Sequence, residues 1–114
     1  MLQVKLSNKG ATLIVGITGE LDHHSSDSVR RKVDAEIMKS HVKNVIFDFS
    51  NVNFMDSSGL GVIMGRYKNI RKLGGKMAVV NPVSQVKRVF ELSGFMKIIE
   101  VYENIESAIN TFAM

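Results

Sequence analysis

Residues 54–61, Phe-Met-Asp-Ser-Ser-Gly-Leu-Gly, decide the fold, because here a buried strand gives way to a helix. Residues 44–49 before this stretch form an apolar run broken only by Asp48, which is typical of a parallel strand covered on both faces. We expect residues 50–55 to be a loop, followed by a helix over residues 57–73. Five apolar residues share one face of that helix before two glycines end it: Leu60, Ile63, Met64, Tyr67 and Ile70.

The segments that precede this stretch predict a hairpin and a helix. Residues 2–7 and 12–18 are apolar and favour strands, and the turn Asn8-Lys9-Gly10 between them contains a glycine that accommodates a positive φ. Residues 25–39 change period, with apolar residues at every fourth position and a serine at the start to serve as the cap. These apolar positions are Val29, Val33 and Ile37.

Downstream of the central helix, strands and helices continue to alternate. Residues 77–80 form an apolar strand, and Asn81-Pro82 begins a helix that Gly94 ends. A short strand around residues 98–101 precedes a last helix from about Asn104. The order ββαβαβαβα predicts an α/β fold with one mixed, largely parallel sheet of about five strands and about four helices. We expect a single domain over residues 1–114.

Composition limits the classes of protein to which the chain can belong. Hydrophobic residues make up 45% of the 114 residues and charged residues 23%, as in an ordered globular domain. The absence of cysteine excludes disulfides and thiolate metal sites. The alternating Leu2, Val4 and Leu6 favour a strand over a signal peptide, and no apolar stretch reaches the roughly 20 residues that cross a bilayer. We therefore expect a cytoplasmic protein without a membrane contact.

The net charge of +4 raises the alternative of a basic protein that binds nucleic acid. Lysines and arginines cluster at residues 30–32, 66–76 and 87–88. Arg71 and Lys72 stand at an expected helix end, where cations offset the helix dipole. Because no recognised nucleic-acid motif or aromatic platform accompanies the charge, we expect no direct binding of nucleic acid.

Residues 54–61 also hold the candidate site, because open α/β sheets bind ligands beyond the carboxyl ends of their strands. Gly59 and Gly61 in a first helical turn each cost about 1 kcal/mol relative to alanine, which suggests that something approaches the backbone closely. A helix amino end stabilises an anion, so a phosphate on Ser57 would be tolerated there, although Asp56 would repel it. The alternative is an ordinary cap at Asp56 or Ser57 followed by packing glycines.

The same stretch does not match the common enzyme motifs. Met55 stands where a G-x-S-x-G nucleophile elbow needs its first glycine, and the Lys-Ser/Thr ending of a P-loop is absent. Besides His41, the imidazoles are those of the adjacent His23 and His24, which we expect to point apart, and this argues against a shared metal site. We expect no catalytic residue, metal or cofactor, with a serine-dependent hydrolase as the alternative.

Three segments make the chain similar to a known family. They are residues 19–24 with Gly-Glu-Leu-Asp-His-His, residues 54–68 with the Asp-Ser-Ser-Gly motif, and residues 93–99 with Ser-Gly-Phe and Lys-Ile-Ile. Over essentially its whole length the chain resembles the single-domain anti-anti-sigma factors of endospore-forming bacteria, members of the STAS family that act on sigma-F in sporulation. The resemblance implies a STAS fold and a regulatory protein, not an enzyme.

The resemblance also implies partners and a switch. In this family the first serine of the motif, here Ser57, accepts a phosphate. The unphosphorylated protein binds a dimeric anti-sigma factor, which is an ATP-dependent serine kinase, and thereby releases sigma-F for sporulation transcription. Phosphorylation by that kinase inactivates the protein, and a metal-dependent serine phosphatase reactivates it.

The expected partner surface combines the loop after the second strand with the start of the central helix. A phosphate adds about −1.5 to −2 charges there, so it blocks the interface without refolding the domain. We expect the protein to be a monomer. Besides Ser57, the residues expected to bind the partner are Asp22, His23, His24, Asp56, Ser58, Gly59 and Gly61.

Overall fold

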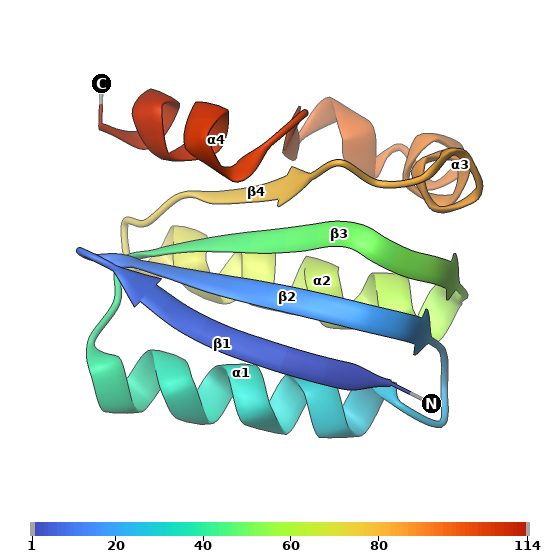
Figure 1. Ribbon diagram of the computed structural model, residues 1–114, viewed down its shortest axis with the longest axis horizontal. Coiled ribbons are helices and arrows are strands. Elements are labelled where there is room, and N and C mark those ends of the chain that lie inside the picture. Colours follow the sequence, from blue (N-terminus) through green and yellow to red (C-terminus); the bar gives the residue numbers. More distant parts are fainter. Residues whose placement is uncertain (1, 114) are drawn as a thin grey trace.

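The computed structural model contains one five-stranded sheet in the order β1-β2-β3-β4-β5 (Figure 1). It describes residues 2–113, so Met1 and Met114 of the expected domain lie outside the described residues. β1 is antiparallel to β2, and the other neighbouring strands are parallel, which confirms the predicted order ββαβαβαβα and the mixed sheet. The elements are β1 (Gln3–Lys9), β2 (Thr12–Leu21), α1 (Ser26–Ser40), β3 (Asn44–Met55), α2 (Ser57–Lys72), β4 (Met77–Val80), α3 (Ser84–Ser93), the 3-10 turn η1 (Phe95–Lys97), β5 (Glu100–Tyr102) and α4 (Ile105–Phe112).

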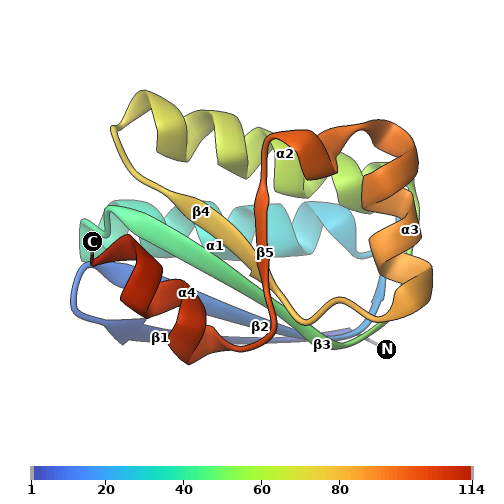
Figure 2. The ribbon, with the colours of Figure 1, turned by 90° about the horizontal axis from the view of Figure 1, so that it is seen from above.

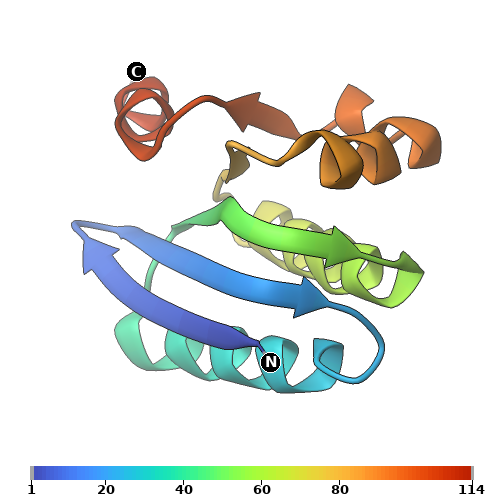
Figure 3. The same ribbon diagram turned by 45° about the vertical axis from the view of Figure 1, so that its right-hand side comes forward.

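Helices cover both faces of the sheet. α1, α2 and α3 contribute side chains to the larger hydrophobic core on one face. α4 packs on the opposite face, where Ala108 joins Ile46, Ala78 and Val80 in a smaller core. Figures 2 and 3 show α1 and α2 together on one side of the sheet and α4 on the other. Because helices cover both faces of the sheet at β4 and at the first part of β3, β4 is continuously apolar and residues 45–49 of β3 are apolar except for Asp48.

β3 shows how alternate side chains serve the two cores. Phe47 and Phe49 point into the larger core, where their ring centroids lie 6.3 Å apart in an edge-to-face arrangement. The Phe49 ring also packs against Phe90 of α3 at 5.8 Å. Between them in sequence, Asp48 belongs to the other face and is half-buried. β3 therefore holds α3 to the sheet through aromatic contacts.

The prediction of a loop over residues 50–55 is wrong, because β3 continues to Met55. β2 likewise continues past residue 18 to Leu21, and its last part pairs with residues 51–55 of β3. This pairing satisfies backbone N–H and C=O groups, which outweighs the weak strand preference of Asn51 and Asn53. As a result, the connections that follow β2 and β3 begin at the same level of the sheet.

Smaller differences lie at element ends. The hairpin turn falls at Gly10 and Ala11, whereas residues 8–10 were predicted to form it. Gly10 has a positive φ, as expected, with a value of 59°. α3 begins at Ser84 instead of Pro82, and β5 is shorter and later than residues 98–101 because η1 precedes it. Within residues 2–113, no helix is long and apolar enough to cross a membrane.

Candidate functional site

Two connections lie together at the carboxyl edge of the sheet. Residues 22–25 join β2 to α1, and Asp56 joins β3 to α2. They are neighbours because β2 and β3 are parallel and end in register, with Leu21 paired to Met55. In Figure 1 both connections lie at the right-hand end of the molecule. This is the edge at which the sequence predicted the candidate site.

Asp56 joins these two connections through its carboxylate. Oδ1 accepts hydrogen bonds from the N–H groups of Ser58 at 2.9 Å and Gly59 at 3.1 Å, so Asp56 is the N-cap of α2. Oδ2 accepts a hydrogen bond from the N–H of His23 at 3.2 Å. The N–H of Asp56 in turn donates to the carbonyl oxygen of Leu21 at 3.4 Å. A single residue therefore fixes both the start of α2 and the position of the β2–α1 loop.

Asp22 organises the β2–α1 loop from within. Its Oδ1 accepts hydrogen bonds from the N–H groups of His24 at 2.9 Å and Ser25 at 3.1 Å. Desolvation alone would raise the pKa of Asp22, but these two N–H donors and the Ser25 hydroxyl together hold the pKa below its usual value of 3.8. Asp22 is therefore an anion at neutral pH. Its carboxylate adds negative charge to the β2–α1 loop.

Ser57 is the first residue of α2, and its side chain is exposed, as predicted. Gly61 lies one turn further along the helix and is also exposed, with nothing within 4 Å of the place that a Cβ would take. Ser58 is half-buried beside them. Ser57 and Gly61 therefore present an open face at the amino end of α2.

The environment of Ser57 differs in one respect from the prediction. We expected free amide groups at the start of the helix to stabilise a phosphate on Ser57. The amides of Ser58 and Gly59 instead donate to Asp56. A phosphate on Ser57 would still gain from the helix dipole, but it would compete with a carboxylate for those donors.

Gly59 is buried, in contrast to Gly61. A Cβ on Gly59 would fall far inside contact distance of the Leu21 carbonyl oxygen and 2.8 Å from the Cγ atom of Met55. The missing side chain therefore allows α2 to approach the ends of β2 and β3 closely. For Gly59 this supports the alternative of a packing glycine, because its buried position leaves little surface for the expected contact with a partner.

The side chains of His23 and His24 are exposed at the same edge. The expectation that they point apart is wrong, because their ring centroids lie 4.1 Å apart with an angle of 35° between the ring planes. The backbone turns at these residues, whereas in an extended strand neighbouring side chains would alternate. Among residues 2–113, no group of three or more histidine and carboxylate side chains is arranged to hold a metal ion.

Phe54 is an exposed apolar side chain at this edge that the sequence analysis did not identify. It lies near the end of β3, opposite Glu20 of β2, and 46% of it is exposed. Its position inside the 54–61 stretch was the available signal, but the expected loop gave no direction to its side chain. Phe54 therefore adds an exposed apolar side chain near this edge, on the face of β3 opposite to the buried Met55.

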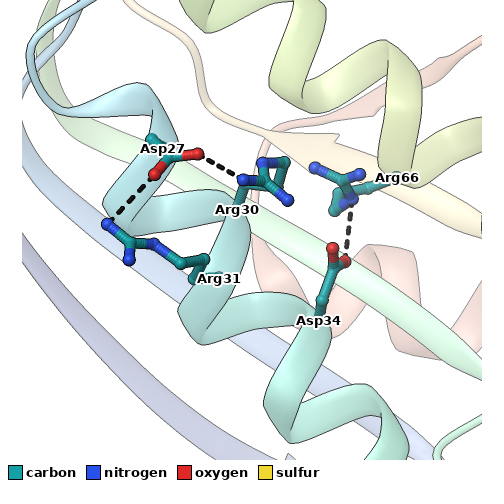
Figure 4. Close-up of polar contacts among 5 residues, drawn as sticks. All are labelled: Asp27, Arg30, Arg31, Asp34 and Arg66. Atoms are coloured by element: carbon teal, nitrogen blue, oxygen red, sulfur yellow. Dashed lines mark hydrogen bonds and ion pairs between the residues drawn. The ribbon is translucent and has the colours of Figure 1, made fainter.

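The sequence placed Arg66 in the run of basic residues at 66–76 and gave it no structural role. It is buried between α1 and α2, where its Nε lies 2.9 Å from Oδ1 of Asp34 (Figure 4). The Nε–H bond does not point along this line, and Nη1 is buried without a hydrogen-bond partner, so the attraction is mainly electrostatic. The burial of Arg66 could have been inferred from its helical spacing. Val62 and Ile70, four positions away on either side, lie on the same face of α2 and are buried.

Comparison with known proteins agrees with this arrangement. The model of the STAS domain matches residues 3–108. The anti-sigma F factor antagonist of Paenibacillus polymyxa is 44% identical over 108 residues, covering 95% of this chain and 92% of that protein. The anti-sigma-B factor antagonist of Bacillus subtilis is 30% identical over 95 residues, covering 83% of this chain and 85% of that protein.

Two solved structures of one relative extend the likeness to three dimensions. The anti-sigma factor antagonist SpoIIAA in its unphosphorylated form has a TM-score of 0.84 and 31% identity, covering 96% of this chain and 95% of that one. The Bacillus cell fate determinant SpoIIAA in its phosphorylated form has a TM-score of 0.76 and 30% identity, covering 96% of this chain and 98% of that one.

Proposed function

Because the chain belongs to the STAS family, and within it to the anti-sigma factor antagonists, we propose that it regulates sigma-F by phosphorylation of Ser57. In this proposal the unphosphorylated chain binds the anti-sigma factor and so releases sigma-F for sporulation transcription. The anti-sigma factor is also a serine kinase, and phosphorylation by it inactivates the chain. A serine phosphatase then restores the binding form.

The observation that carries the proposal is the exposed Ser57 at the start of α2, between two connections that Asp56 holds together. A kinase needs a hydroxyl that it can reach, and the exposed Ser57 meets this requirement. In the transfer, Ser57 Oγ forms a bond to the γ-phosphorus of ATP, ADP leaves, and the hydroxyl proton passes to a base of the kinase or to water. This chain supplies the acceptor and acts as a regulatory protein.

The charges around Ser57 explain how a phosphate would end binding. It adds about −1.5 to −2 charges next to the carboxylate of Asp56, at the same edge as the anionic Asp22. Because Asp56 already accepts hydrogen bonds from Ser58 and Gly59, the added charge remains at the surface that meets the partner. The interface then carries repulsive charge without any change in the fold.

The rest of the partner surface is proposed from residues that share this edge. His23 and His24 project from the β2–α1 loop, Gly61 leaves space one turn above Ser57, and Phe54 offers an apolar contact. Asp22 and Asp56 shape the loops, and Ser58 lies beside the acceptor. We propose that the protein acts as a monomer on this surface.

The choice of sigma-F over sigma-B rests on sequence likeness. The identity is 44% to the anti-sigma F factor antagonist and 30% to the anti-sigma-B factor antagonist, over similar lengths. A direct comparison would measure binding to the purified anti-sigma-F and anti-sigma-B factors. Tighter binding to the anti-sigma-B factor would show that the chain regulates sigma-B instead of sigma-F.

Phosphorylation itself is tested with the cognate anti-sigma kinase, ATP and mass spectrometry. The unmodified chain and Ser58→Ala should each gain one phosphate that maps to Ser57, whereas Ser57→Ala should gain none. A phosphate on Ser58 or on any other residue would exclude the switch as proposed. An ester-hydrolysing activity lost in Ser57→Ala would favour the hydrolase alternative instead.

A further inference from the structure

The end of the molecule opposite Ser57 carries a concentration of positive charge. Six exposed cations lie at the carboxyl ends of α1 and α2 and at the adjacent ends of the strands, at the left of Figure 1. Among residues 2–113 none of these six takes part in an ion pair; the pairs involve Arg30, Arg31 and Arg66. The six are Lys9, Lys39, Lys43, Arg71, Lys72 and Lys76.

Backbone contacts bring these cations to one place. The N–H of Lys76 donates to Oδ1 of Asn44 at 2.9 Å, and its carbonyl oxygen accepts the N–H of Val45 at 3.0 Å. The N–H of Lys43 donates to the carbonyl oxygen of Ala11, in the turn that follows Lys9, at 2.8 Å. Helix dipoles account for cations in the last turns of α1 and α2, but not for Lys9, Lys43 and Lys76 outside the helices.

An apolar hollow opens between α1 and α2 beside this charge. Its volume is about 370 Å³, and Ile37, Met38, Ile70 and Leu73 form most of its lining. Met38 and Leu73 are 78% and 66% exposed, although large apolar side chains are usually covered. Lys72 also lines the hollow, so apolar and positive groups meet at one site.

We propose that this end of the molecule is a second docking surface, for an acidic amphipathic segment of a partner protein. Apolar side chains of the segment would enter the hollow between α1 and α2, and its carboxylates would pair with Lys72, Lys39 and Arg71. The match is one of charge and shape together, because Lys72 lines the apolar hollow and the other exposed cations lie at the same end of the molecule.

Other anionic partners fit this surface less well. A single-stranded nucleic acid would stack its bases on aromatic side chains, whereas the hollow is lined mainly by Ile, Met and Leu. A duplex would contact the cations through its phosphates and leave the apolar hollow empty. An anionic membrane presents no projecting side chain to enter a hollow. A protein segment can place an apolar side chain next to Asp34 and its carboxylates further out.

The location has a consequence for the switch. The molecule is 30 Å long, and the Debye length is about 8 Å at physiological ionic strength, so a phosphate on Ser57 is screened from the opposite end. We infer that a partner held at this second surface stays bound whether or not Ser57 is phosphorylated. This docking surface does not depend on the function proposed for Ser57.

The test uses two synthetic amphipathic peptides of about 18 residues, roughly five helical turns. Both carry leucine on one face; the other face is glutamate in one peptide and lysine in the other. Titration into the isotope-labelled full chain should shift the amide signals of Met38, Lys72 and Leu73 with the glutamate peptide and not with the lysine peptide. Shifts confined to another part of the chain, or none, would overturn the proposal.

Variants separate the docking surface from general attraction between opposite charges. Leu73→Glu and Lys72→Glu should each weaken binding of the glutamate peptide by about tenfold or more. Lys87→Glu, the matched control at an exposed lysine of α3, at the other end of the molecule in Figure 1, should change this binding little. Met38→Glu provides a second apolar variant should Leu73→Glu prove unstable. Ser57→Asp should leave peptide affinity within about twofold, because its charge is screened at that distance.

Two further probes test the other classes of partner. Vesicles containing phosphatidylglycerol and a short duplex DNA are each offered to the same labelled chain. Shifts at Met38 and Leu73 with vesicles, in the absence of any response to the peptide, would replace the proposal by a membrane contact. The same pattern with DNA would reinstate the nucleic-acid alternative.

Discussion

The carboxylate of Asp56 accepts a hydrogen bond from the backbone N–H of His23 at 3.2 Å, although 33 positions separate these residues in the sequence. The same carboxylate caps α2. The two loops of the candidate site are therefore held by one side chain, and the strength of this connection can be measured.

Replacement of Asp56 tests that connection. Asp56→Ala removes the acceptor for three N–H groups and should lower the free energy of unfolding by about 0.5–2 kcal/mol. Asp56→Asn retains a capping oxygen, so its free energy of unfolding should fall much less. Urea unfolding followed by circular dichroism measures both. Equal stability of Asp56→Ala and the unmodified chain would show that the cap contributes little.

The two glycines of the motif should respond in opposite ways to the same change. Gly59→Ala places a Cβ against Leu21 and Met55 and should cost about 1–3 kcal/mol of stability. Gly61→Ala meets open space and should stabilise the helix by up to about 1 kcal/mol. Thermal unfolding of both variants decides this. Gly61→Leu should also fold but weaken binding to the anti-sigma kinase, and unaffected binding would remove Gly61 from the proposed interface.

Charge at Ser57 should control binding independently of folding. Ser57→Ala should bind the anti-sigma kinase as the unmodified chain does, whereas Ser57→Asp should bind at least about tenfold more weakly. Circular dichroism should show the same fold for both. Ser107→Asp, at an exposed serine in the first turn of α4 on the other face of the sheet, is the position control and should bind as the unmodified chain does. Tight binding by Ser57→Asp would mean that negative charge at this position does not operate the switch.

The ion pair between Arg66 and Asp34 should matter more than those on the surface. Asp34→Ala leaves the buried guanidinium of Arg66 without its carboxylate and should lower the unfolding free energy by about 1–3 kcal/mol. Asp27→Ala breaks two exposed pairs and should have a much smaller effect. Chemical unfolding of the two variants makes the comparison. A larger loss in Asp27→Ala would contradict this account of the α1–α2 contact.

The lowered pKa of Asp22 predicts part of the acid sensitivity. The stabilisation from its ionised carboxylate is fully present above the unfolded-state pKa of about 3.9 and is lost as the pH falls through the lower folded-state pKa. Asp22→Asn should therefore lose less stability than the unmodified chain between neutral and strongly acidic pH. An NMR titration of the Asp22 carboxyl group with its midpoint at or above 3.8 would disprove this.

The sequence predicted the order of elements because their patterns are strong. Helical spacing on α1 and α2 and the apolar runs of β3 and β4 need no tertiary information. The length of β3 was not predictable in this way, since Asn51 and Asn53 belong to a strand only because β2 lies beside them. The strand is extended by backbone pairing between segments that are distant in the sequence, and local propensity contains no information about such pairing.

The candidate site was predictable in part for a similar reason. Asp56 and Ser57 follow from the cap pattern, and the meeting of their connection with the β2–α1 loop follows from parallel strands. Gly59 is buried and Gly61 is open because α2 approaches Leu21 closely at Gly59. This approach is a tertiary contact, which the local sequence does not indicate. The burial of Arg66 is similar, because it depends on the contact between α1 and α2.

One property of the link between His23 and Asp56 bears on how such proteins diverge. Asp56 holds the neighbouring loop through a backbone N–H, a group that nearly every residue type provides. The imidazole of His23 is exposed and has no part in this bond. Mutation can therefore exchange the side chain at position 23 while the loop keeps its shape. Duplicated genes of this kind can acquire separate partners at that position with little loss of stability.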